Sequence, residues 1–389
     1  MVLACLIALA GLKLGSEFHR LVWEAGRYGA IDLAQRYLEV QLWFSGLPVY
    51  GEIEHASYPP ASYLILWPLV GWAQFQFVRW FWAILSIISM IWLVRLLVRE
   101  CDCRSVTERF FVALIPLSMN ATGIALGNGQ LAILILPLLV YIVALAGQGQ
   151  RKRSTEFAIG ALFVLALVKP TFAAPFFLIL LFVFPGYRTA GAIVIGYLLL
   201  TLLASIFQEP GVITLTANWL EYAYAINTDA AVELDYGSVH TWLTAIGLSQ
   251  WNSAASILLL AGLGVWIFRV RRVELWLIFG VTALIARMWT YHGIYDDMLI
   301  IIPIIAVYRH VKLVSKSSSP ELSSLLLLAG SIFVMLVPVR LFFAWSPPWP
   351  YLYAVSHIFF WLWLLLYLVC AASEENRNIP SKPETAIRQ

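Results

Sequence analysis

Apolar runs of roughly twenty residues recur along almost the whole chain, and short polar or basic stretches separate them. A helix of that length crosses the hydrocarbon core of a bilayer, which is about 30 Å thick. The runs are continuous rather than alternating, so they favour transmembrane helices over a membrane β-barrel. Only 12% of the residues are charged, whereas soluble domains carry about 25%. The sequence therefore predicts an all-α polytopic membrane protein.

Basic residues cluster in loops that the positive-inside rule places in the cytoplasm, at 99–109, 151–153, 188, 269–272 and 309–316. If every apolar piece crossed separately, the tail would lie on the other side from these loops. One piece between residues 60 and 126 is therefore expected to be re-entrant or fused with its neighbour. We expect about twelve transmembrane helices in one domain, residues 1–371, and a polar cytoplasmic tail, 372–389. The main external loops are then 15–59, 208–250 and 287–297.

Several classes of function are excluded or disfavoured. The net charge is only +3, and nothing indicates nucleic acid binding. The four cysteines form no disulfide framework, and a zinc site would need histidines beside them. A Gly-rich phosphate loop of the nucleotide-binding kind is absent from the sequence. Residues 2–14 lack a basic n-region and an obvious cleavage site, so they are interpreted as a first transmembrane helix rather than a signal peptide. We expect no cofactor, no metal ion and a monomer.

Residues 30–44 carry an unusual density of charge for this chain and show helical periodicity. Asp32, Arg36 and Glu39 fall on one face, and apolar residues including Leu38 fall on the other. This pattern predicts an amphipathic helix lying in the membrane interface, with Asp32 in its first turn. A carboxylate there is held ready as a base in its ionised form. The alternative is a solvated face in which Asp32 forms an ion pair with Arg36.

Three further stretches place polar groups at the external ends of apolar runs. Tyr58 precedes two prolines and is restrained toward an extended conformation; the alternative is an interface tyrosine. Lys169 precedes Pro170, which breaks the helix, so it either reaches the surface or binds an anion. Asn128 and Gln130, in "GNGQ", offer hydrogen-bond donors or simply form a tight turn.

The densest polar cluster is "RMWTYHGIYDD", residues 287–297. An aromatic belt explains its Trp and Tyr residues but not Arg287 and His292, which are suited to meet an anion. Asp296 and Asp297 fit a solvated helix N-terminus, or alternatively a divalent cation site.

Taken in order, "DLAQRY", "GLPVY", "YPP", "GNGQ", "LVKP" and "WTYHGIYDDML" resemble glycosyltransferase family 87, polytopic mannosyltransferases of the GT-C type. The resemblance spans roughly residues 15–310. It implies a GT-C helical bundle with interfacial helices in the first external loop, a polyprenyl-phosphate sugar donor, usually mannose, and inverting transfer. It also implies general base catalysis by Asp32, donor-phosphate contacts from His292 and Lys169, and a substrate contact from Gln130. Arg287 is a further candidate for a donor-phosphate contact, on the grounds of its charge. Tyr58, Asn128 and Arg36 are further candidates for substrate binding.

The chemistry suits these residue types. The leaving phosphate gains negative charge as the glycosidic bond breaks, and cationic groups stabilise that charge. The acceptor, a lipid or a glycan, loses a hydroxyl proton to a positioned carboxylate. We expect an enzyme of the plasma membrane with its active site on the external face. One rival is a lipid or solute transporter or flippase without chemistry, which would place ionisable residues mid-helix. Another is a lipid-linked oligosaccharide ligase or polymerase.

Overall fold

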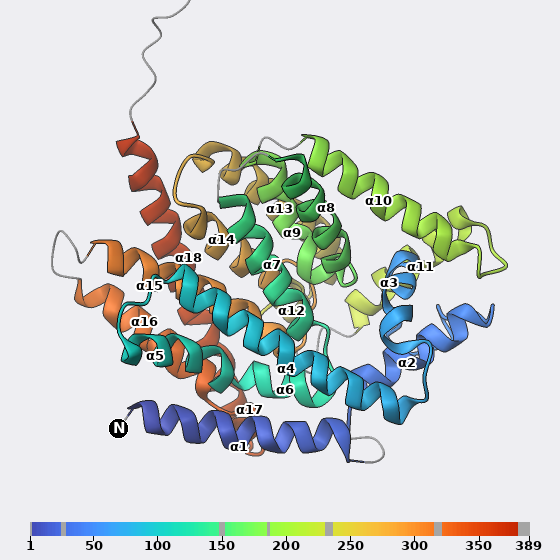
Figure 1. The fold of residues 1–389 in the computed structure, drawn as a ribbon, viewed down its shortest axis with the longest axis horizontal. Coiled ribbons are helices and arrows are strands. Elements are labelled where there is room, and N and C mark those ends of the chain that lie inside the picture. Colours follow the sequence, from blue (N-terminus) through green and yellow to red (C-terminus); the bar gives the residue numbers. More distant parts are fainter. Residues whose placement is uncertain are drawn as a thin grey trace, which may run out of the picture.

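A computed structural model describes residues 2–24, 29–147, 152–184, 187–229, 236–314 and 321–379. Within those ranges the chain is helical, with no strand. Figure 1 shows helices packed side by side, with α1 along one edge of the molecule and α10 along another. The predicted all-α class is therefore confirmed.

The helices of the N-terminal half are α1 (Val2–Val22), α2 (Ile31–Phe44), α3 (Pro60–Val70), α4 (Phe75–Glu100), α5 (Val106–Ser118), α6 (Asn120–Asn128), α7 (Ala132–Gly147), α8 (Arg153–Ala166), α9 (Pro170–Phe182) and α10 (Tyr187–Ser205). The remainder are α11 (Val212–Asp229), α12 (Val239–Ala245), η2 (Ser249–Trp251), α13 (Asn252–Val270), α14 (Leu275–Met288), η3 (Ile294–Ile300), α15 (Ile301–Val314), α16 (Leu322–Leu336), α17 (Val339–Phe343) and α18 (Trp349–Asn378).

Membrane-spanning potential is concentrated in a few long helices. Of the described helices, four are long and apolar enough to cross a membrane: α4, α10, α13 with η2, and α18. Helices α5 and α6 together make a fifth candidate, bent by 53°. This bent pair lies mostly within residues 60–126, the region expected to hold a re-entrant or fused piece. Helices α3, α7, α9, α14 and α16 are apolar but shorter. The protein is thus embedded in a membrane, and the count of about twelve crossings stays a prediction.

Three of the basic loops, 99–109, 269–272 and 309–316, lie at one end of the bundle. Lys312 at the end of α15 donates to the Cys101 carbonyl (2.9 Å) and pairs with Glu108 (2.5 Å). Arg309 pairs with Glu274, the residue before α14 (2.8 Å). Helices α4 and α14 run away from this end, and in Figure 1 the start of α4 lies near α2. The N-terminal turn of α2 and the C-terminal turn of α14 therefore lie toward the opposite end.

Two predicted boundaries are wrong. The first external loop was expected to begin at residue 15, but α1 continues to Val22. In this part of α1, Arg20 pairs with Glu17, and one turn earlier Lys13 donates to the Ser118 carbonyl at 2.9 Å. The tail was expected to begin at residue 372, but α18 continues to Asn378. Residues 380–389 lie outside the described residues. Most of the expected loop 208–250 is helical, in α11, α12 and η2.

The predicted helix over residues 30–44 is confirmed as α2, but its environment differs from the solvated alternative. Arg36 and Glu39 are buried, Glu39 completely, whereas Ile31 and Leu38 are 44% and 49% exposed. The polar face therefore turns into the protein and the apolar face turns outward. That orientation suits a helix lying at a membrane surface.

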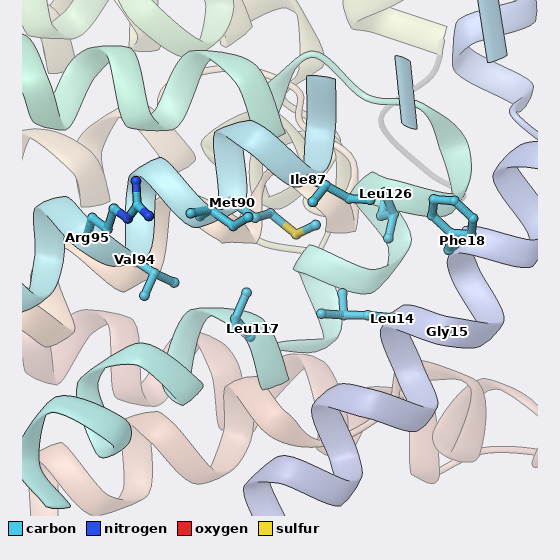
Figure 2. Close-up of a pocket in the computed structure, with 10 residues that line it drawn as sticks. Leu14, Gly15, Phe18, Ile87, Met90, Val94, Arg95, Leu117 and Leu126 are labelled. Atoms are coloured by element: carbon cyan, nitrogen blue, oxygen red, sulfur yellow. The ribbon is translucent and has the colours of Figure 1, made fainter. Parts of the chain in front are cut away.

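An apolar groove of about 520 Å³ opens between α1 and α4, with the bent pair α5 and α6 as its floor (Figure 2). Its lining residues are Leu14, Gly15, Phe18, Ile87, Met90, Ile91, Val94, Arg95, Leu117 and Leu126. Arg95 is the single charged residue among them.

Candidate functional site

The first turn of α2 is fixed against the end of α6. Helix α6 ends with Gly129 in the left-handed region (φ 72°), where glycine is favoured. Ala30, directly before α2, also has positive φ (52°), which is uncommon for a residue with a side chain. Its backbone N–H donates to the Gly127 carbonyl at 3.1 Å, and Ala30 is buried. This contact holds the start of α2 beside "GNGQ".

Asp32 consequently lies next to both polar residues of that turn. Burial raises the pKa of Asp32, and the amides of Gln130 and Asn128, with Arg36 and Lys169, oppose the shift. Its Oδ2 atom is buried and has no hydrogen-bond partner among the described residues. The structure thus brings Asp32, Asn128 and Gln130 together, and "GNGQ" is a helix C-cap rather than a simple turn.

The alternative interpretation, an ion pair between Asp32 and Arg36, is not what the structure shows. Arg36 instead pairs with Glu39 at 2.9 Å, and its guanidinium carbon lies 4.2 Å from the centre of the Tyr58 ring. Glu39 also accepts a hydrogen bond from Gln35 at 3.1 Å. Helical spacing permits either acid as a partner of Arg36, and the completely buried Glu39 is the one that pairs with it. Arg36 and Tyr58 therefore form one wall of the site beside Asp32.

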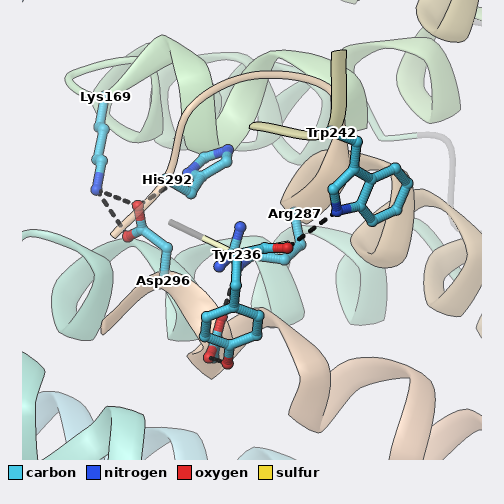
Figure 3. Close-up of polar contacts among 7 residues, drawn as sticks. Lys169, Tyr236, Trp242, Arg287, His292 and Asp296 are labelled. Atoms are coloured by element: carbon cyan, nitrogen blue, oxygen red, sulfur yellow. Dashed lines mark hydrogen bonds and ion pairs between the residues drawn. The ribbon is translucent and has the colours of Figure 1, made fainter. Parts of the chain in front are cut away.

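Lys169 and His292 meet at one carboxylate, that of Asp296 (Figure 3). The Lys169 ammonium lies 2.7 Å from each Asp296 oxygen, and His292 Nδ1 lies 2.8 Å from Oδ2. Pro170 begins α9 and restrains Lys169 to an extended conformation (φ −123°, ψ 85°). Lys169 is only 6% exposed, so the alternative in which it reaches the surface is wrong.

The pKa values of this cluster follow from its burial and its pairing. Burial opposes the ionisation of Asp296, but Lys169 and His292 outweigh it and lower the Asp296 pKa to about 2. Burial lowers the pKa of His292, against the influence of Asp296. We therefore take His292 as neutral, with Nδ1–H donating to the ionised Asp296.

Arg287 occupies a second pair beside the first. Its Nε atom donates to Asp297 Oδ1 at 2.5 Å, and Tyr236 donates to Asp297 Oδ2 at 2.6 Å. The guanidinium carbon of Arg287 lies 5.0 Å from the centre of the Trp361 ring. Trp242 in turn donates to the Tyr236 carbonyl at 2.9 Å, as Figure 3 shows. The reversal between α14 and η3 is what brings Arg287 and Asp297 together.

Each cation of this region has a carboxylate partner among the described residues: Lys169 has Asp296, Arg287 has Asp297, and Arg36 has Glu39. Asp32 is the exception, since it has no ion pair within 4 Å among the described residues. Tyr295 lies in the same region, with its ring centre 5.0 Å from the Lys169 ammonium. The site thus contains one carboxylate that no cation neutralises directly.

A metal site is not apparent from the chemistry of these groups. In the described ranges, no group of three or more His, Cys, Asp or Glu side chains is arranged to hold a metal ion. The aspartates that could have bound a divalent cation are instead paired with Lys169, His292 and Arg287. The expectation of metal independence stays a prediction.

Sequence reasoning missed the carboxylates that hold the cations. Asp296 and Asp297 were expected at a solvated helix N-terminus, but both are 1% exposed. A signal was present, because buried cations need counter-ions and two aspartates stand within ten residues of Arg287. Glu39 was placed on the polar face of its helix but not assigned as the partner of Arg36. Tyr236 and Trp361 were not singled out, and only the tertiary fold brings them to this site.

A comparison with family models matches the middle of the chain, and the matched range does not include Asp32. The family model described as glycosyltransferase family 87 matches residues 57–295. Neither a curated protein nor a solved structure gives a match to the chain. The family match disfavours the transporter interpretation. Because the match covers more than half of the 389 residues, the chain belongs to glycosyltransferase family 87 and is a membrane glycosyltransferase.

Proposed function

We propose that the protein transfers a sugar, mannose, from a polyprenyl-phosphate donor to a lipid or glycan acceptor, with inversion. Asp32 acts as the general base. The observation that carries this proposal is the unmatched carboxylate: Asp32 alone among the acidic groups of the site has no ion-pair partner within the described residues. A carboxylate tied to a cation is a poor proton acceptor, and Asp32 is not tied.

In the chemical step the acceptor oxygen attacks the anomeric carbon and its proton passes to Asp32. The bond between the anomeric carbon and the phosphate oxygen breaks, and its electron pair stays on that oxygen. General base catalysis of this kind contributes about 10²–10⁴-fold. Burial raises the pKa of Asp32, which strengthens it as a base once it is ionised. One carboxylate is sufficient, because a phosphate leaving group needs little acid assistance.

The departing phosphate is stabilised by Lys169, His292 and Arg287. Lys169 and His292 share Asp296, so one phosphate placed near that carboxylate contacts both side chains. Asp296 and Asp297 hold these groups in place before the donor arrives, which avoids a cost of reorganisation during the reaction. A phosphate next to His292 raises the pKa of the imidazole, since a nearby negative charge favours the protonated form.

A lipid-linked donor is supported by the depth of the site. Helix α14 has 14 residues and is about 21 Å long, whereas the hydrocarbon core of a bilayer is roughly 30 Å thick. Arg287 lies in its last turn and begins the site. If α14 starts at the basic, cytoplasmic end, it ends before the external membrane interface. A lipid phosphate reaches such a site by lateral diffusion in the bilayer. We place the active site on the external face of the plasma membrane on this basis and from the positive-inside rule.

The acceptor and the sugar are assigned to the polar wall around Asp32. Asn128 and Gln130 flank the carboxylate, and Arg36 with Tyr58 forms the adjacent side. Amide and guanidinium groups hydrogen-bond to sugar hydroxyls, and an aromatic ring covers an apolar sugar face.

The test uses purified full-length protein in detergent with radiolabelled polyprenyl-phosphate-mannose and a lipid extract of the host. We expect label to move to a new lipid, and Asp32→Asn to lower the rate by at least about 100-fold. Glu54→Gln is the matched control, because Glu54 is an exposed acid of the same loop (side chain 89% exposed) and should leave the rate unchanged. Full activity in Asp32→Asn would remove Asp32 from the role of base, and no turnover of this donor would refute the donor assignment.

A further inference from the structure

The groove between α1 and α4 ends at Arg95, whose charge has no counter-ion among the described residues. Arg95 is exposed and makes no hydrogen bond or ion pair with any residue that the structure describes. The other lining residues are apolar, and Met90 lies in the middle of the groove between Arg95 and Leu126 (Figure 2). An apolar channel with one cation at its end is complementary to an amphiphile that has an anionic headgroup.

The location of Arg95 identifies the membrane surface from which such a molecule comes. Arg95 lies five residues before the end of α4 at Glu100, which is about 7.5 Å along the helix. That end carries the basic loops, including Arg104 and Lys312, and the positive-inside rule makes it cytoplasmic. A long arginine side chain at this depth reaches the phosphate level of the cytoplasmic leaflet.

The dimensions of the groove fit a chain from one leaflet. From Arg95 to Ile87 on α4 the lining extends about 12 Å, close to half of the roughly 30 Å hydrocarbon core. Its volume of about 520 Å³ is within the range of about 300–1,000 Å³ usual for ligand sites. Gly15 leaves the α1 wall open, because a Cβ atom there would meet nothing within 4 Å.

We propose that this groove binds an anionic phospholipid of the cytoplasmic leaflet, with its phosphate on Arg95 and one acyl chain between α1 and α4. Basic pockets between membrane helices on the cytoplasmic side are suited to anionic headgroups. The site is separate from Asp32 and the phosphate cluster, so the inference does not depend on the proposed transfer reaction.

The test is native mass spectrometry of delipidated full-length protein, titrated with phosphatidylglycerol or phosphatidylcholine that carry identical acyl chains. We expect the first phosphatidylglycerol to bind about fivefold more tightly than phosphatidylcholine, as one basic side chain near an anionic lipid gives. Arg95→Gln should abolish this preference, whereas Gly15→Leu should weaken the binding of both lipids by filling the groove.

Each variant has a matched control. Arg104→Gln removes a basic residue from the same end but outside the groove, and Gly11→Leu adds the same side chain to an open face of the same helix. Both should bind lipid as the unaltered protein does. Equal effects of Arg95→Gln and Arg104→Gln would mean that the charge of the whole surface is responsible and would overturn the proposal. If Arg95→Gln or Gly15→Leu changes the fraction of dimer in the mass spectra but not the binding of lipid, the groove is instead an interface with a second copy of the chain.

Discussion

Asp296→Asn removes the charge that holds Lys169 and His292 together while keeping the size of the side chain. Asp296 is almost completely buried, and both other groups are buried around it. Removing one partner of a buried ion pair costs about 3–5 kcal/mol, since the remaining charge stays out of water. Asparagine keeps one oxygen as an acceptor, so we expect the lower end, about 3 kcal/mol. Equilibrium unfolding of the purified protein in mixed micelles measures this loss.

The double variant Lys169→Gln/Asp296→Asn tests the cause of the loss. It leaves no uncompensated charge at this pair, so its unfolding free energy should lie above that of Asp296→Asn alone. Asp102→Asn serves as the control, because Asp102 is 75% exposed with Arg104 at 3.7 Å, and a surface pair contributes about 0–1 kcal/mol. If Asp296→Asn costs no more than Asp102→Asn, the Lys169–Asp296 pair does not hold the cluster together.

Two further predictions concern the polar face of α2. Arg36 lowers the pKa of Asp32 by its charge, so Arg36→Gln should move the acidic limb of the pH–rate profile to higher pH; an unmoved limb would contradict the assigned coupling. Burial raises the pKa of Glu39 to about 7, although Arg36 opposes the shift. The contribution of Glu39 to stability is therefore complete below the pKa of this glutamate in the unfolded chain, and it is lost as pH rises through 7. Glu39→Gln should remove that fall, so its unfolding midpoint should change less between pH 5 and pH 8 than that of the wild type, and an equal change in both proteins would refute the reasoning.

The sequence could predict the features that local patterns encode, such as where a helix begins and ends. Helical periodicity located α2 to within a residue, and the prolines at 60 and 170 marked helix starts because proline is favoured in the first turn of a helix. The pairing of charges could not be predicted in the same way. Arg36 has acids three residues ahead and four behind, and the choice of Glu39 depends on which face packs inward. The partnership of Lys169 with Asp296 joins positions 127 residues apart, which no local pattern specifies.

The pairing of these cations with carboxylates has a consequence for the proposed reaction. With Lys169, Arg287 and Arg36 each paired with a carboxylate, an ionised Asp32 adds a negative charge to these described groups before the donor binds. A phosphodiester donor adds one negative charge, and cleavage leaves a monoester that carries one more. The proton that Asp32 accepts from the acceptor hydroxyl offsets that gain, so the total charge of the buried site does not change during transfer. In a low-dielectric environment a change in net charge is costly, so a base placed beside the phosphate cluster lowers the barrier electrostatically as well as by removing the proton.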